Sequence, residues 1–227
     1  MSLPFSEYVT MDGRSARTAG TSCVMYLLAI SDRLISENVA GVSRTFAVVA
    51  VSRHPRRPLD AAIRACRVWD PKETGGAVDF DEVERFLRFL RQGGCREGHP
   101  PSLPLPGCRE CDAGVFTRPG FNVVCVVYDP YQTHQMMQRL RQIAWCDEFP
   151  QGRERAIADS LMHKLALRNQ LAHHGDLRLR QHVLNARAKL SKDDDSRMRM
   201  IKRSPSRKID LAVAASMAID RCLYLNL

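Results

Sequence analysis

The feature that most constrains the fold is the segment Asn122–Tyr128, which is apolar at nearly every position. Apolar side chains at consecutive positions, instead of alternate ones, predict a strand that is buried on both faces of a sheet. Asp129-Pro130 ends this strand, and a helix is predicted directly after it from the spacing of Met136, Met137 and Leu140. A strand, a loop and a helix in succession indicate an α/β unit.

The segments before this unit predict a small sheet. Three runs rich in strand-forming residues follow one another, 23–31, 45–52 and 61–69. Since no helical pattern separates them, we expect an antiparallel meander. Asp79 is suited to cap a helix whose apolar side chains recur at helical spacing, namely Phe80, Val83, Phe86, Leu87 and Leu90.

Further helices are predicted downstream. They span 154–167, 177–190 and 208–225, and a short strand is expected over 197–202. The whole pattern predicts a mixed β-sheet flanked by helices. A chain of 227 residues has the length of one domain. We assign that domain to 23–227 and expect residues 1–22 to be an irregular lead-in.

Nothing in the chain predicts a membrane span or a secretory leader. No run approaches the roughly 18 apolar residues that a membrane helix needs. We therefore expect no membrane partner and an intracellular location. The eight cysteines are mostly scattered among apolar residues, a pattern typical of buried, reduced thiols.

The segment 93–120 is rich in Gly and Pro and has no periodic pattern, which predicts a long excursion between helix and strand. It contains Cys95-x3-His99 and Cys108-x2-Cys111. Four such side chains could bind a structural Zn²⁺ tetrahedrally, although the first half-site has an irregular spacing. The alternative is a loop that simply carries several free thiols.

The positive charge lies towards the C-terminus. The chain carries a net charge of +9, and residues 151–227 alone contain 16 Lys and Arg against 8 Asp and Glu. A basic surface attracts polyanions, so nucleic acid is the first partner to consider. The alternative is a well-solvated basic surface with no binding role.

Three aspartates could bind divalent cations. Asp129 ends the most apolar strand, Asp32 ends the first strand, and Asp210 lies in the first turn of the last helix. If these positions converge, they could hold two Mg²⁺ or Mn²⁺ ions about 4 Å apart, as hydrolysis of a phosphodiester requires. Each aspartate also has an ordinary structural interpretation, as a turn, a loop cap or a partner of the helix dipole.

Several motifs, in order, resemble the nuclease domain of large terminase subunits from tailed bacteriophages. They include Val126-Val-Tyr-Asp129-Pro-Tyr-Gln132, Leu171-Ala-His-His-Gly175 and Ile201-Lys-Arg-Ser-Pro-Ser-Arg-Lys-Ile-Asp210. Upstream, Ala47-Val-Val-Ala-Val-Ser-Arg-His-Pro55 and Arg67-Val-Trp-Asp-Pro71 are similar to the same family. The resemblance covers roughly 44–92 and 121–227.

This resemblance implies a ribonuclease H-like fold and a metal-dependent endonuclease that cuts concatemeric double-stranded DNA during genome packaging. Two acidic residues of the family fall on Asp129 and Asp210. The family's first acidic residue has no clean match, because Val39 stands near its expected place. Asp32 is the nearest strand-terminal aspartate, with Glu37 and Asp12 as alternatives.

The resemblance also implies further partners and a location. Lys202, Arg203, Arg207 and Lys208 are expected to contact DNA phosphates, and Arg153, Arg155 and Arg187 extend this set. A small terminase subunit and a portal protein are candidate partners, in the cytoplasm of an infected host or of a bacterium carrying a prophage. The chain contains no Gly-x-x-x-x-Gly-Lys-Ser/Thr loop, so no ATPase is predicted in it. The alternative function is a DNA-binding or packaging-assembly module of the same fold with an incomplete acidic site.

Overall fold

The computed structural model describes residues 45–54, 56–73, 76–118, 120–130, 133–190 and 197–226, and the backbone of 22–29. The expected lead-in 1–22 therefore lies outside the described residues, apart from Ser22, which begins β1. Among the helices of these ranges, none has the length and apolar character to span a bilayer.

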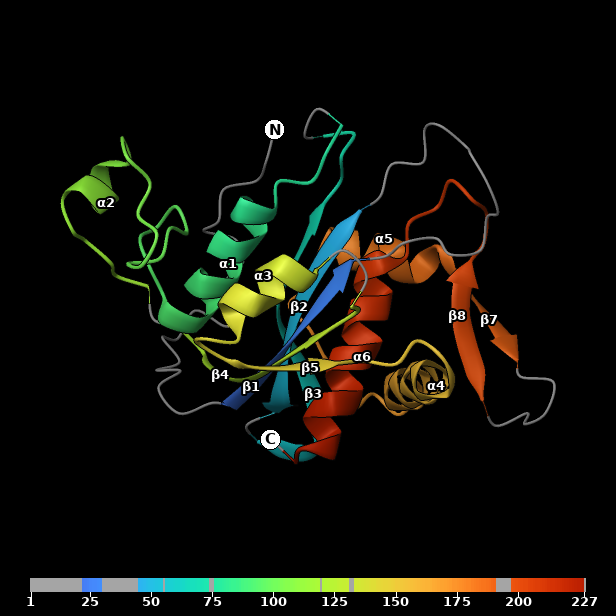
Figure 1. The fold of residues 1–227 in the computed structure, drawn as a ribbon. Helices are drawn as coiled ribbons and strands as arrows, with labels where there is room; N and C mark the ends of the chain where they lie inside the picture. Colours follow the sequence, from blue (N-terminus) through green and yellow to red (C-terminus); the bar gives the residue numbers. More distant parts are fainter. Residues whose placement is uncertain are drawn as a thin grey trace.

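A six-stranded mixed sheet forms the centre of the molecule (Figure 1). Its strand order is β5-β4-β1-β2-β3-β6. Antiparallel pairing joins β2 to both β1 and β3, whereas β1 pairs with β4, β4 with β5 and β3 with β6 in parallel. The predicted meander is therefore confirmed. The strands are β1 (Ser22–Ala29), β2 (Phe46–His54), β3 (Arg57–Trp69), β4 (Asn122–Tyr128), β5 (Trp145–Glu148) and β6 (Leu171–Ala172).

Helices cover both faces of this sheet. On one face lie α1 (Phe80–Gln92) and α3 (His134–Leu140). The opposite face is covered by α4 (Arg153–Leu167), α5 (Leu177–Leu184) and α6 (Asp210–Tyr224). A short helix, α2 (Arg109–Asp112), lies in the excursion that follows α1. The hairpin of β7 (Ala186–Leu190) and β8 (Met198–Lys202) forms a separate two-stranded sheet.

The two-sided burial explains why the central strands are apolar throughout. In β2, Ala47 and Val49 pack towards α6, whereas Val48 and Ala50 pack towards α1 and α3. The helix α6 is buried along almost its whole length, as expected for a helix that is apolar on all sides. Its alanines allow it to approach the sheet closely.

Helix α1 begins and ends as the sequence predicts. The side chain of Asp79 accepts hydrogen bonds from the backbone N–H groups of Asp81 and Glu82, at 2.9 and 3.3 Å. Gly93 ends the helix with a φ of +75°, which residues with a Cβ adopt only with strain.

The predicted helix 177–190 is wrong in its second half. The helix ends at Leu184, and Ala186–Leu190 forms β7 instead. The residue between them, Asn185, is tied to two distant backbone groups. Its Nδ2 donates to the carbonyl of Lys208 at 3.0 Å, and its carbonyl accepts from the N–H of Arg203 at 2.9 Å. These tertiary contacts end the helix where the local sequence alone would continue it.

Candidate functional site

Asp129 lies directly after β4, at the carboxyl end of the strand. Along β4, Cys125 and Val127 pack towards α6, whereas Val126 and Tyr128 pack towards α1 and α3. If the alternation of side chains continues beyond the end of the strand, Asp129 follows Val127 and Cys125 on the α6 side. Its carbonyl accepts a hydrogen bond from the Thr133 hydroxyl at 2.8 Å, which links the end of β4 to the residue before α3. Asp129 is half-buried at this edge.

Asp210 is the first residue of α6 and is only 1% exposed. Its carboxylate accepts a hydrogen bond from the hydroxyl of Thr45, the residue just before β2. A carboxylate in the first turn of a helix is stabilised by the helix dipole and by the free N–H groups there. The start of α6 thus places a carboxylate, a group that can bind a metal ion, beside the beginning of β2.

The strand register brings the two aspartates to one edge of the sheet. Tyr128 of β4 pairs with Leu27 of β1, and β1 then pairs with the start of β2, Ala29 lying opposite Phe46. Only β1 separates β4 from β2, a lateral spacing of about 10 Å between the two strands. The end of β4, next to Asp129, and the start of β2, next to Asp210, therefore lie at the same edge of the sheet, although the two aspartates are 81 positions apart in the sequence.

The first acidic residue predicted for this site is not part of the described structure. Asp32 and its alternatives Glu37 and Asp12 all lie outside the described residues. Within the described ranges, Asp70 follows β3 at the same edge, since Trp69 pairs with Phe46. Its Oδ1 accepts from the N–H of Lys72 at 3.0 Å, an arrangement typical of an Asx turn.

His182 holds the first turn of α6 in position, a role that the sequence did not reveal. Its Nδ1 accepts a hydrogen bond from the N–H of Leu211 at 2.9 Å. Burial, followed by the charge of Arg178, lowers the pKa of His182 to about 4. The imidazole is therefore neutral near pH 7 and can accept this bond, which satisfies one of the free N–H groups of the helix start.

The predicted phosphate-binding residues lie in and beside the connection from β8 to α6. Arg203 and Arg207 are exposed, whereas Lys202 and Lys208 are half-buried. The guanidinium of Arg203 donates to the carbonyl of Ala186 at 2.9 Å. This connection ends at Asp210 and so leads to the edge of the sheet where Asp129 and Asp210 lie, which we call the acidic edge. Of the residues expected to extend this set, Arg153 and Arg187 are also exposed.

Arg155 does not belong to this basic surface, and its prediction as a DNA contact is wrong. It is 4% exposed, and its Nε forms an ion pair with Asp159 at 2.9 Å. Asp159 is fully buried and also accepts from the Ser216 hydroxyl at 2.6 Å and from the N–H of Met200 at 2.8 Å. This cluster joins α4, α6 and β8 and has a structural role.

Two groups of side chains bring metal-binding atoms close together within the described residues. The predicted set Cys95, His99, Cys108 and Cys111 is brought together, with its ligand atoms within 4.8 Å of one another. A second group, which the sequence did not predict, consists of Cys66, His174 and Asp176. Burial, followed by the charge of Asp176, raises the pKa of the Cys66 thiol well above its usual range, so this thiol remains protonated.

Comparison with solved structures identifies the fold. The chain is similar to the crystal structure of the HK97 bacteriophage large terminase, with 14% identity and a TM-score of 0.55, over 96% of this chain. It spans only 43% of the length of that terminase. The similarity shows a ribonuclease H-like α/β fold, as predicted from the sequence.

Two other similar structures are terminase nucleases. One is the large terminase nuclease of thermophilic phage G20c with bound magnesium, at 14% identity and a TM-score of 0.44, over 86% of this chain and 80% of that one. The other is the nuclease domain of the Thermus phage P74-26 large terminase, at 14% identity and a TM-score of 0.43, over 94% and 90%.

No curated protein matches the sequence. The model of one protein family, described as the endonuclease domain of the terminase large subunit, matches residues 110–224, which is half of the chain. The matched range includes both Asp129 and Asp210. The chain therefore belongs to the terminase large subunit endonuclease domain family.

Proposed function

We propose that this chain is a metal-dependent endonuclease that cuts concatemeric double-stranded DNA during phage genome packaging. The observation that carries the proposal is the strand register, in which β4 ends just before Asp129 and β2 begins beside Thr45, the residue that is bonded to Asp210. Membership of the endonuclease domain family and the basic connection beside this edge support it.

The proposed metal ligands are Asp129 and Asp210, with Asp32 as the third carboxylate. The donor set fits Mg²⁺ or Mn²⁺, because hard divalent cations prefer carboxylate oxygens held on rigid elements. The carboxylate of Asp210 is held by the Thr45 hydroxyl at the start of α6, and the backbone carbonyl of Asp129 accepts a hydrogen bond from Thr133. A buried carboxylate at a sheet edge is costly unless a cation or hydrogen bonds compensate its charge.

The residues of the chain would position the reacting groups. When bound, two divalent ions would activate the attacking water and stabilise the leaving oxygen of the phosphodiester. Asp129 and Asp210 would offer their carboxylate oxygens to the ions, and Thr45 would orient the carboxylate of Asp210. His182 would keep the first turn of α6 in place through its bond to Leu211.

Four cations are proposed to hold the DNA backbone beside this site, Lys202, Arg203, Arg207 and Lys208. Contacts from Lys and Arg to phosphates fix the position of the duplex without reading its sequence. A small terminase subunit and a portal protein are proposed as protein partners, in the cytoplasm of the infected or prophage-carrying bacterium.

The direct test is cleavage of supercoiled plasmid by the purified chain. We expect nicked and linear products with Mn²⁺ or Mg²⁺ and none with EDTA, together with DNA binding that weakens as salt is added. Binding without any cleavage in Mn²⁺ would favour the alternative, a DNA-binding or packaging-assembly module. Cleavage restricted to branched DNA would instead indicate a resolvase-type nuclease.

Thr45→Val should weaken metal binding without unfolding the domain. The substitution removes the hydroxyl that donates to Asp210 and keeps a side chain of similar shape. Loss of an interaction that orients a metal ligand typically lowers metal affinity about 10–100-fold. We therefore expect the Mn²⁺ concentration for half-maximal cleavage to rise by about that factor. Thr45→Ser, which keeps the hydroxyl, should behave like the wild type. Equal metal dependence in all three proteins would exclude this role.

A further inference from the structure

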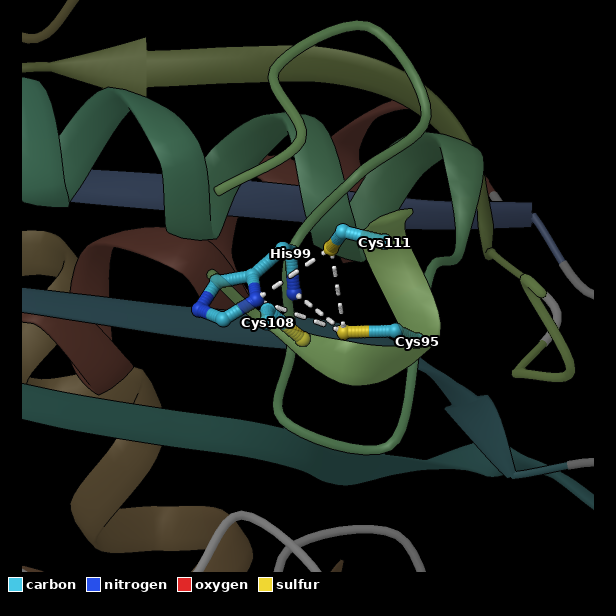
Figure 2. Close-up of side chains that lie close together, drawn as sticks. All are labelled: Cys95, His99, Cys108 and Cys111. Atoms are coloured by element: carbon cyan, nitrogen blue, oxygen red, sulfur yellow. Dashed lines mark hydrogen bonds between the residues drawn. The ribbon is translucent and has the colours of Figure 1, made fainter. Parts of the chain in front are cut away.

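A cluster of sulfur and nitrogen atoms lies in the excursion between α1 and β4. Figure 2 shows the side chains of Cys95, His99, Cys108 and Cys111 pointing towards a common centre. Cys95, Cys108 and Cys111 are 0%, 5% and 8% exposed, and His99 is half-buried. All three cysteines are free thiols.

The spacing of these atoms matches that of a tetrahedral site. The two sulfurs of Cys95 and Cys111 are 3.8 Å apart, and Nδ1 of His99 lies 3.4 Å from the first and 3.5 Å from the second. In a tetrahedral zinc site, bonds of about 2.3 Å to sulfur and about 2.05 Å to nitrogen place two sulfurs about 3.8 Å apart and a sulfur about 3.6 Å from a nitrogen. The sulfur of Cys108 completes the group, within 4.8 Å of the others.

We propose that Cys95, His99, Cys108 and Cys111 bind one structural Zn²⁺, which forms the folding centre of residues 93–120. Three thiolates and one imidazole are a ligand set that zinc prefers. Because these four side chains would fill all four tetrahedral positions, none is left open for water or substrate, which is typical of structural rather than catalytic zinc.

The rest of the excursion buries too few apolar side chains to form a hydrophobic core of its own. Among its described residues, the only buried apolar cluster consists of the three cysteines, with Phe116 packed against them. Its other large apolar side chains, Leu103, Leu105 and Val115, are 38%, 39% and 42% exposed. A segment that buries so little apolar surface does not offset the entropy lost on ordering it. A zinc ion would supply the missing free energy.

The backbone around the cluster already has the form of a ligand-binding turn. The N–H of His99 donates to Sγ of Cys95 at 3.3 Å, a bond that would stabilise a thiolate. Gly98, with a φ of +89°, allows the turn between these two residues. Glu110 accepts from the N–H of Arg96 at 2.7 Å, which connects the first half-site to α2, where the second half-site lies.

The excursion is closed at its base and lies far from the acidic edge. Gly94 and Arg118 exchange backbone hydrogen bonds of 2.8 and 2.9 Å, so the chain leaves and returns at one point. A Cβ at Gly94 would lie 2.2 Å from the carbonyl oxygen of His99, so only glycine fits there.

The chain leaves the excursion at the beginning of β4, whereas Asp129 follows the end of β4, about 20 Å away along the strand. In Figure 1 the excursion projects beyond α1, on the opposite side from the β7–β8 hairpin. The zinc would therefore not take part in DNA cleavage.

The test is the zinc content of the chain purified without chelators and kept reduced, measured by elemental mass spectrometry. We expect about one zinc per chain. Cys95→Ser and Cys111→Ser should each lose most of it. Two matched controls should retain it: Cys146→Ser changes a thiol outside the cluster, and His174→Ala disrupts the other Cys/His group. Retention in Cys111→Ser together with loss in His174→Ala would overturn the proposal.

A second measurement on the wild-type chain does not depend on the folding of variants. Replacement of zinc by Co²⁺ should produce the visible absorption bands of tetrahedral cobalt with thiolate ligands. Removal of the metal should increase hydrogen exchange in 93–120 while β4 stays protected. A reduced, folded chain that binds neither Zn²⁺ nor Co²⁺ would show that the three cysteines are merely packed thiols.

Discussion

Asp129→Asn and Asp210→Asn are each expected to lower the rate of Mn²⁺-dependent plasmid cleavage by about 1,000-fold, since metal ions contribute several kcal/mol to such reactions. Asparagine has nearly the size of aspartate but lacks its charge, so the fold should persist while the divalent ion loses a ligand. DNA binding should remain, with the same dependence on salt, because phosphate contacts come from separate cations.

The matched control for these variants is Asp220→Asn. Asp220 lies in the same helix as Asp210 but near its other end, away from the acidic edge. Its burial raises the pKa of its carboxyl, and no metal role is assigned to it. Cleavage by Asp220→Asn should equal that of the wild type. Normal cleavage by either Asp129→Asn or Asp210→Asn would show that the residue is not a metal ligand.

Asp159→Ala is expected to produce the largest loss of stability among single substitutions at buried polar groups. Asp159 is fully buried and accepts hydrogen bonds from Arg155, Ser216 and the N–H of Met200. Removal of one partner of a buried ion pair typically costs about 3–5 kcal/mol, because the other charge remains buried and uncompensated. For a domain of this size, that loss corresponds to a fall of roughly 6–20 °C in Tm.

This prediction is checked by urea and thermal unfolding of the variant. Glu154→Ala is the control, because Glu154 lies in the same helix but is exposed, and its Tm should change little. Replacement of the whole pair by apolar residues, as in Arg155→Met with Asp159→Leu, should recover part of the lost stability. If Asp159→Ala is as stable as Glu154→Ala, the buried cluster does not hold α4, α6 and β8 together.

The parts of the fold that the sequence predicted are those with strong local patterns. The strand Asn122–Tyr128 is buried on both faces, and the helix capped by Asp79 begins where its cap indicates. The excursion was identified from its lack of periodicity, and its four metal-binding side chains from their spacing. In each case the residues close in sequence carried the information.

The elements that were missed depend on contacts distant in sequence. β5 is a four-residue edge strand with no fully buried side chain, so no apolar pattern marks it. β7 exists because Asn185 is bonded to Arg203 and Lys208. Arg155 looked like a surface cation because its ion-pair partner, Asp159, is held in the core by Ser216 and Met200, which lie 57 and 41 positions from Asp159 in the sequence. Thr45 and His182 carry no motif, and only the fold places them beside the start of α6.

The most direct test of the central claim is an anomalous difference map from crystals of the chain soaked in Mn²⁺. The account predicts a manganese peak at the edge of the sheet, within about 2.2 Å of a carboxylate oxygen of both Asp129 and Asp210. Manganese bound elsewhere, or bound at this edge by neither aspartate, would contradict it.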